Sequence, residues 1–106
     1  MIRIPRRARN ITLALLAGAT LPGAMAQDMV LARNLAATCA NCHGTNGKAV
    51  PGSGMSSLAG ESKANLLQKL ADFKSGDKPA SIMHQIAKGY TEAQLTLIAD
   101  YYAAQK

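Results

Sequence analysis

The feature that most constrains this chain is the pentapeptide Cys39-Ala40-Asn41-Cys42-His43, which holds both of its cysteines and one of its two histidines. Cysteines three positions apart on a helix project to the same side, so both sulfur atoms can reach one partner. The adjacent histidine is then brought under the same partner. A Cys-x-x-Cys-His pentapeptide is typical of c-type haem attachment, in which both thiols bond to the porphyrin and the histidine ligates the iron.

Three other uses of this motif fit the sequence less well. A disulfide between Cys39 and Cys42 would close a very short loop and constrain little of the unfolded chain. A thioredoxin-type redox pair is expected in a β-α-β context, and no segment alternates like a strand. A structural zinc site needs four ligands, and beyond the motif only His84 is available. The motif therefore favours covalent haem c, with Cys39 and Cys42 as attachment sites and His43 as proximal ligand.

The composition also favours a prosthetic group at the centre of the domain. A chain of 106 residues is one small domain at most, and its aromatic content is only 4% although 48% of it is hydrophobic. Large aromatic side chains supply much of the burial in small domains, so something else has to fill this centre. Domains below about 70 to 80 residues usually need a disulfide, a metal, a cofactor or a partner.

Residues 1–26 have the pattern of a removable export signal. Four arginines precede an uncharged, mostly apolar run over 11–21, Pro22 and Gly23 interrupt it, and Ala24-Met25-Ala26 is a small-x-small cleavage site. The apolar run is too short to span a bilayer, which disfavours the alternative of an uncleaved anchor. We predict cleavage after Ala26, a domain over 27–106 in the periplasm, and no stable membrane insertion.

Most of the positive charge belongs to this signal. Removing residues 1–26 takes away four of the twelve Lys and Arg residues and none of the six Asp and Glu, which lowers the net charge from +6 to +2. Nothing that remains interleaves basic and aromatic residues, so no nucleic acid partner is expected. The remaining lysines could steer an acidic partner, but a solvated surface is the simpler interpretation at this charge. They include Lys48, Lys63, Lys69, Lys74, Lys78 and Lys88.

Hydrophobic periodicity predicts an all-α domain around an irregular central loop. Helices are expected over about 28–39, 62–76, 80–88 and from 91 to the C-terminus. Asp28 and Ser62 are the expected N-caps of the first two helices, and Thr91 opens a capping box with Gln94. Segment 44–60 holds too many Gly, Ser and Pro residues for a regular element.

An electron-transfer haem needs a second axial ligand, and four side chains are candidates. Met29 lies too far back on the first helix, and Met55 has a more ordinary role in apolar packing. Met83 has enough chain before it to approach from the side opposite His43, so we favour it. His84 is the rival, because neighbouring helical residues point about 100° apart and only one of the pair can face the iron.

Other side chains are expected to keep the site dry or to pack the helices. The candidate apolar wall of the site is Leu66, Leu70, Phe73, Ile82 and Ile86. Tyr101 and Tyr102 are expected to pack the last helix against Ala32 and Ala36 of the first.

With these motifs in place, residues 27–106 resemble class I cytochromes c of the small bacterial periplasmic kind. The resemblance implies short helices wrapped around one haem c, with Cys39 and Cys42 as thioether attachments, His43 as proximal ligand and Met83 as distal ligand. Family members usually carry Pro where this chain has Ser56, close to the carbonyl that accepts a hydrogen bond from the proximal histidine. Which carbonyl orients His43 is therefore open.

Segment Ser81–Tyr90, together with the closing helix, is similar to the cytochrome subunit of flavocytochrome c sulfide dehydrogenases. That resemblance implies an electron-accepting subunit, not itself catalytic, whose flavoprotein partner oxidises sulfide. The alternatives are a free electron carrier to a terminal oxidase or another respiratory partner, and a ligand-binding or sensor haem protein in which Met83 dissociates.

Overall fold

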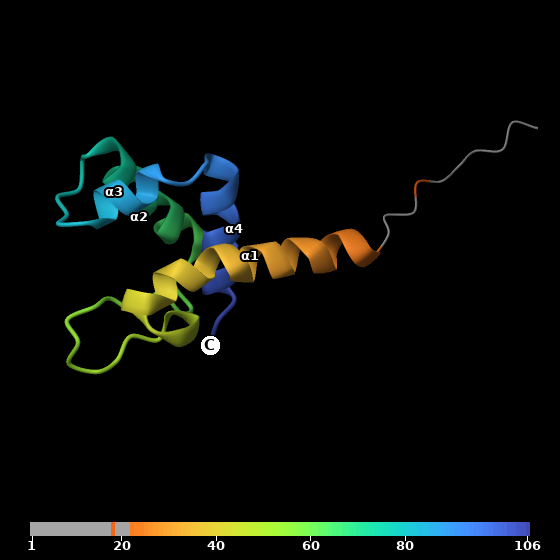
Figure 1. Cartoon of the computed structure of the whole chain (residues 1–106), viewed down its shortest axis with the longest axis horizontal. Coiled ribbons are helices and arrows are strands. Elements are labelled where there is room, and N and C mark those ends of the chain that lie inside the picture. The colour runs from red at the N-terminus through yellow and green to blue at the C-terminus, as the bar shows by residue number, and fades with distance from the viewer. Residues whose placement is uncertain (1–17, 19–21) are drawn as a thin grey trace, which may run out of the picture.

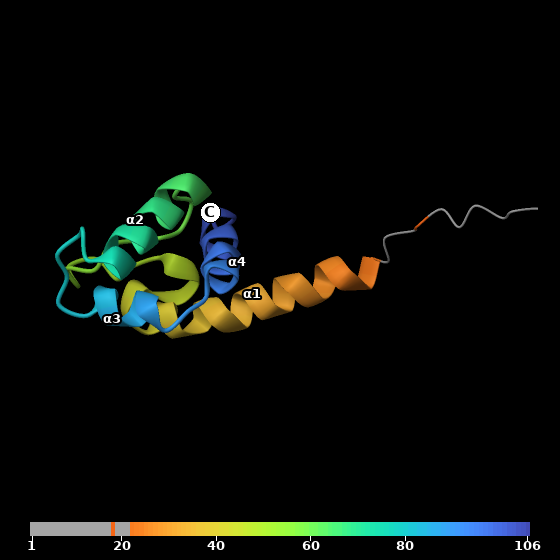
Figure 2. The ribbon, with the colours of Figure 1, turned by 90° about the horizontal axis from the view of Figure 1, so that it is seen from above.

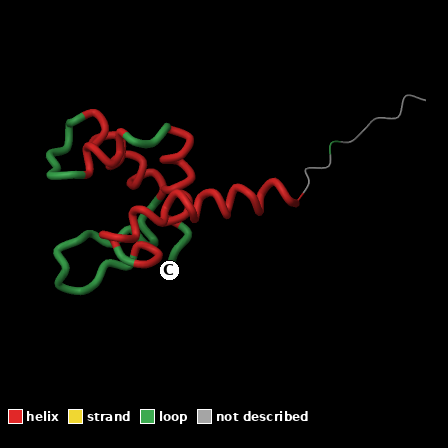
Figure 3. The backbone as a smooth tube through the Cα atoms, viewed as in Figure 1, coloured by secondary structure: helices red, strands yellow, loops and turns green. Residues whose placement is uncertain are grey.

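The computed structural model describes residue 18 and residues 22–106. This part of the chain contains helices and loops and no strand (Figure 3), which confirms the predicted all-α fold. The elements in chain order are α1 (Pro22–His43), the 3-10 helix η1 (Thr45–Gly47), α2 (Lys63–Ser75), α3 (Met83–Lys88) and α4 (Glu92–Ala103). No helix within residue 18 and residues 22–106 is long and apolar enough to cross a membrane.

The first helix is longer than the sequence pattern predicted. α1 begins at Pro22, so Asp28 lies inside the helix and the prediction that it is the N-cap is wrong. Pro is favoured at the first helical position, and the Ala, Met and Gln residues that follow are good helix formers, so nothing delays the helix to residue 28. The helix also continues beyond Cys39 to His43. The whole Cys-x-x-Cys-His motif therefore lies on its last turns.

Most of the predicted export signal, residues 1–17 and 19–21, lies outside the described residues. Cleavage after Ala26 stays a prediction. The N-terminal half of α1 extends away from the other helices (Figures 1 and 2), and Met25, Met29 and Val30 on it are exposed.

The predicted caps of α2 and α4 are confirmed. Ser62 Oγ accepts a hydrogen bond from the Asn65 backbone N–H at 3.2 Å. Thr91 Oγ1 accepts from the Gln94 backbone N–H at 3.2 Å, and the Gln94 side chain accepts from the Thr91 N–H at 2.9 Å. These reciprocal bonds satisfy donors that a helix N-terminus otherwise leaves unpaired.

The third helix begins later than predicted. Residues 80–82 were expected to be helical, but helical geometry begins at Met83, after Ile82 with φ −142° and ψ −30°. No side chain caps this end of α3. Without a capping side chain, no local hydrogen bond stabilises an earlier start of the helix, closer to Pro79.

The core lies where α1 crosses α4 (Figures 1 and 2), and Tyr102 is at its centre. Tyr102 is 1% exposed and donates from Oη to the carbonyl of Ala36 at 2.5 Å, so the predicted packing of this tyrosine on α1 is confirmed. Tyr101 also packs against this cluster and donates to Asn46 Oδ1 at 2.7 Å, beside η1. The other buried members of the cluster are small or aliphatic: Ala36, Leu66, Leu95, Ile98 and Ala99.

Candidate cofactor site

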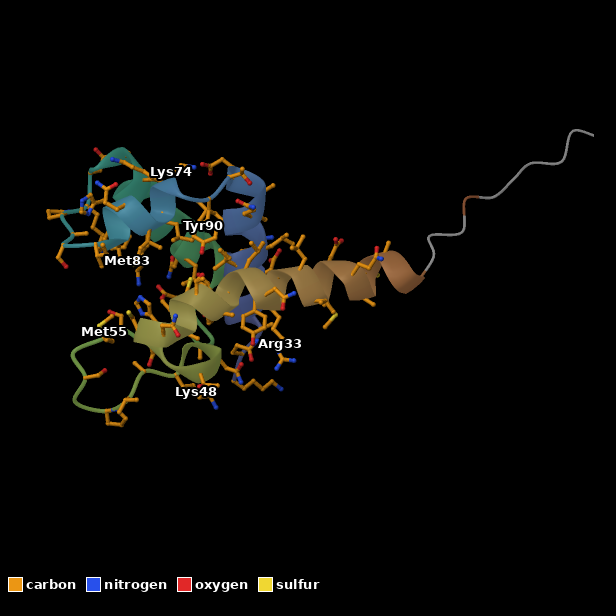
Figure 4. All side chains as sticks on the ribbon, viewed as in Figure 1. Arg33, Lys48, Met55, Lys74, Met83 and Tyr90 are labelled. Atoms are coloured by element: carbon orange, nitrogen blue, oxygen red, sulfur yellow. The ribbon has the colours of Figure 1, made fainter. Side chains whose placement is uncertain are left out.

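A cavity of about 540 Å³ opens between two walls of the domain. The histidine wall is the end of α1, residues 38–43, together with loop 54–61. The methionine wall is α2 together with residues 78–86, and α4 lies behind both. Figure 4 shows Met55 and Met83 on opposite sides of the opening. The volume falls within the range of about 300 to 1,000 Å³ that is usual for small-molecule and cofactor sites.

All four residues predicted to hold a cofactor line this cavity: Cys39, Cys42, His43 and Met83. Three of them are neighbours on the last turns of α1, and the fourth comes from α3 across the cavity. Both cysteines are free thiols. Burial raises the pKa of the Cys39 thiol, so this cysteine is held in its neutral form.

His43 is oriented by a backbone carbonyl. Its side chain is 9% exposed, and Nδ1 lies 2.6 Å from the carbonyl oxygen of Ser56. A carbonyl can only accept, so Nδ1 carries a proton, and in the neutral ring Nε2 keeps its lone pair. This tautomer is the one that can ligate a metal through Nε2. The sequence did not identify the carbonyl that orients His43, and in the structure it is that of Ser56.

The loop that presents this carbonyl is held against η1. The backbone N–H of Leu58 donates to the carbonyl of Gly47 at 2.7 Å, and Ser57 Oγ accepts from the Ala49 N–H at 3.0 Å. Gly47 has φ +78°, and a Cβ there would lie 2.6 Å from the Tyr102 ring. Only glycine allows this close approach, so the packing of Tyr102 helps to place the Ser56 carbonyl.

Gly44 ends α1 directly after the motif. Its φ is +88°, and a Cβ at this position would lie 1.9 Å from the carbonyl oxygen of Lys48. A side chain would therefore both strain the backbone and collide with it. The turn at Gly44 lets the chain leave the helix immediately after His43 and wrap back as the loop that carries Ser56.

The structure distinguishes the four candidates for a second axial ligand. Met83 is partly buried and lines the cavity, whereas His84 is not among the lining residues. His84 Nδ1 is buried with no hydrogen-bond partner in the described part of the chain. Met29 is 73% exposed on the projecting part of α1, and Met55 lines the cavity beside His43 on the same wall.

The cavity is mostly apolar. Every residue of the predicted apolar wall lines it: Leu66, Leu70, Phe73, Ile82 and Ile86. Sequence analysis missed the contribution of α4, which adds Ile98, Ala99 and Tyr102. The signal was present, since residues 95, 98, 99 and 102 follow helical spacing, but we assigned that face only to helix packing.

Most of the lysines considered as steering charges contact other side chains of the same molecule. Lys63 pairs with Asp100 at 2.7 Å and Lys74 with Glu92 at 2.8 Å. At the cavity itself, Lys69 pairs with Glu61, and the Lys78 ammonium lies 5.3 Å from the centre of the Phe73 ring. Of these two lysines, one is therefore neutralised by an ion pair, and the other keeps its charge beside an aromatic ring.

The amino-acid sequence was compared with those of known proteins. No family model matches the chain. The chain is 40% identical over 68 residues to the cytochrome subunit of sulfide dehydrogenase of Chlorobaculum tepidum, which covers 64% of this chain and 60% of the relative. It is 37% identical over 71 residues to the thiosulfate dehydrogenase electron acceptor of Thiomonas intermedia, covering 67% and 33% of the two chains. It is 31% identical over 96 residues to cytochrome c4 of Pseudomonas aeruginosa, covering 91% and 47%.

The all-α fold and these relatives define the class as small c-type cytochromes, with a fold consistent with class I cytochromes c. Within this class the chain is related to the cytochrome subunit of sulfide dehydrogenase. The aligned region spans between 33% and 60% of the length of these three relatives.

Proposed function

We propose that this chain is a monohaem c-type cytochrome that carries single electrons. The observation that supports the proposal is the convergence of Cys39, Cys42, His43 and Met83 on one largely apolar cavity. Two free thiols on one helix face fit the two thioether attachments of haem c, and the Nε2 lone pair of His43 fits an axial ligand. The Met83 side chain supplies a thioether from the opposite wall. The residues present therefore fit the group.

When bound, haem c supplies an iron that alternates between the ferric and ferrous states. The chain's own residues set the conditions for that exchange. The Ser56 carbonyl holds the His43 ring in one orientation and increases the basicity of its ligating nitrogen. Ligation by Met83 favours a higher reduction potential than a second histidine would. The apolar side chains of α2 and α3 exclude water from the cavity.

The partner we propose is the flavoprotein subunit of a sulfide dehydrogenase, with this chain as its electron acceptor and no catalysis of its own. The relative from Chlorobaculum tepidum supports this assignment, and the one from Thiomonas intermedia is also named for accepting electrons from a dehydrogenase. The similarity to cytochrome c4 supports the alternative of a free carrier that serves another respiratory partner. A ligand-binding haem is the third candidate.

We further propose that the protein is exported to the periplasm and cleaved after Ala26. The basic start, apolar run and small-x-small site of residues 1–26 support this location. Intact-mass measurement of the protein from its native host tests it, because a mature chain that begins at Gln27 and carries one haem has a unique mass.

The function is tested by purifying the tagged, haem-loaded protein from the periplasm of its native host. We expect a flavoprotein to co-elute in stoichiometric amount and to reduce the haem when sulfide is added. A monomer with haem bands alone, reducible by a respiratory donor but not by sulfide, would establish the free carrier instead. Carbon monoxide separates the third candidate, because an electron-transfer haem with Met83 firmly bound keeps its reduced spectrum in the presence of the gas.

A further inference from the structure

We propose that Tyr90 is a positioning residue that holds the two walls of the cavity at a fixed separation and so keeps Met83 in place. The inference rests on the proposed ligation by His43 and Met83. Tyr90 does not line the cavity, but it follows α3 by two residues and lies between α3 and α4. Figure 4 shows it between α1 and the part of the molecule that carries Lys74 and Met83.

The side chain of Tyr90 reaches the histidine wall. Its Oη lies 2.6 Å from Thr38 Oγ1, and Thr38 immediately precedes Cys39. Thr38 Oγ1 also donates to the carbonyl of Leu35 at 3.0 Å. A hydroxyl has one proton to donate, so Thr38 uses its own on Leu35 and Tyr90 must be the donor of the shared bond.

The backbone of Tyr90 is fastened to the methionine wall. Lys74, on the last turn of α2, donates from Nζ to the carbonyl of Tyr90 at 2.8 Å and to Glu92 Oε1 at 2.8 Å. The N–H of Gly89 donates to the carbonyl of Ile86 at 3.0 Å, which ties the same turn to α3. Tyr90 is thus bonded to α1 through its side chain and to α2 through its main chain.

This link matters because α3 depends on tertiary contacts for its position. α3 has six residues, and no side chain caps its N-terminus. A helix this short is unstable without tertiary contacts, since helix nucleation is unfavourable. Among the hydrogen bonds of residues 22–106, the Tyr90–Thr38 bond is the one that joins α1 directly to residues 83–90. Its loss would free α3, with Met83, to move away from the histidine wall.

The experiment uses the haem-loaded, oxidised protein and titrates it with imidazole, which replaces the distal ligand and is followed by absorbance. Apparent imidazole affinity rises with the fraction of molecules in which Met83 is detached. One hydrogen bond changes such an equilibrium by about two- to tenfold. We therefore expect Tyr90→Phe to tighten apparent imidazole binding by about two- to tenfold. Amide hydrogen exchange should also accelerate in α3 while that of α2 is unchanged.

Matched variants separate this role from a general loss of stability. Tyr101→Phe also removes a long-range tyrosine hydrogen bond, to Asn46 at 2.7 Å, but does not connect the walls, so its imidazole affinity should equal wild type. Thr38→Val should reproduce Tyr90→Phe, and the double variant should add nothing. Unchanged imidazole affinity and α3 exchange in Tyr90→Phe, or an equal effect of Tyr101→Phe, would overturn the proposal.

The wild-type spectrum keeps this test separate from the proposed function. A far-red sulfur-to-iron band that disappears in Met83→Ala supports the ligation on which the inference rests. If that band is absent from wild type, the proposed ligation fails, whereas the exchange rate of α3 in Tyr90→Phe still decides whether Tyr90 holds this helix.

Discussion

The two walls of the cavity are built in different ways. The histidine wall stands on a helix of 22 residues that crosses α4, and its histidine is hydrogen-bonded to a backbone carbonyl. The methionine wall presents Met83 from a helix of six residues without a side-chain cap, beside Ile82 at 53% exposure. The ligating residues of the first wall therefore stand together on one long helix, and the short helix of the other depends on contacts with distant residues. We expect changes on the first wall to decide whether the cofactor is held and changes on the second to decide how it behaves.

The largest expected effect is on the histidine wall. Replacing Cys39 and Cys42 together by Ala removes both thiols that can bond to the porphyrin, so we expect complete loss of covalent haem. Haem staining after denaturing electrophoresis measures this directly. The double replacement Met83→Ala and His84→Ala is the control, since it leaves both thiols in place and should retain the stain. Staining of the double cysteine variant would contradict the attachment sites.

Met83→Ala should leave haem attached but change its electronic properties. We expect the far-red sulfur-to-iron band of the oxidised protein to vanish and the reduction potential to fall, because methionine ligation raises the potential of a histidine-ligated haem. His84→Ala is the matched neighbour and should keep the band. If His84→Ala removes the band instead, the assignment of the distal ligand is reversed.

Tyr102 gives a further test of the comparison, because it lies on α4 behind both walls of the cavity. Tyr102→Phe should lower the free energy of unfolding by about 1 to 3 kcal/mol, because the carbonyl of Ala36 is left buried without its donor. Chemical denaturation measures this loss. Tyr101→Phe, whose bond to Asn46 is more exposed, should cost less. An equal loss in both variants would show that the buried bond to Ala36 contributes no more to stability than the exposed bond to Asn46.

The same tyrosine predicts a pH dependence of stability. Burial raises the pKa of Tyr102 above its ordinary value of 10.0, so the folded state holds this proton more tightly than the unfolded state. The resulting stability is fully present below about pH 10 and is lost as the pH rises further. Tyr102→Phe should flatten this alkaline loss in denaturation curves recorded between about pH 9 and 11. Identical curves for the variant and wild type would assign the alkaline loss to other groups.

The smallest expected effect is at Ser56. Its carbonyl, not its side chain, orients His43, and its own N–H makes no hydrogen bond within residues 22–106. Ser56→Pro keeps the carbonyl and removes this N–H and the serine hydroxyl, which also makes no hydrogen bond within residues 22–106, so we expect an unchanged reduction potential in a potentiometric titration. A clear shift would show that the serine side chain or the loop conformation, and not the carbonyl alone, sets the orientation of His43.

The sequence predicted what depends on near neighbours. The caps at Ser62 and Thr91 follow from side chains that bond within three residues, and the Cys-x-x-Cys-His motif lies within little more than one helical turn. The starts of α1 and α3 were predicted wrongly. At Asp28 a good capping residue lies within a run of good helix formers, and at residues 80–82 hydrophobic spacing suggested a helix that has no cap to begin it.

The sequence by itself determined the all-helical fold class and marked the candidate side chains for the proposed haem, because motif spacing and helical periodicity are local properties. Only the tertiary structure decided that Met83 and not His84 lines the cavity, that the carbonyl of Ser56 orients His43, and that Tyr90 joins the two walls. These relations depend on the crossing of α1 and α4 and on the direction in which α3 packs. A backbone carbonyl is present at every residue, so no residue type in the sequence marks the one that acts.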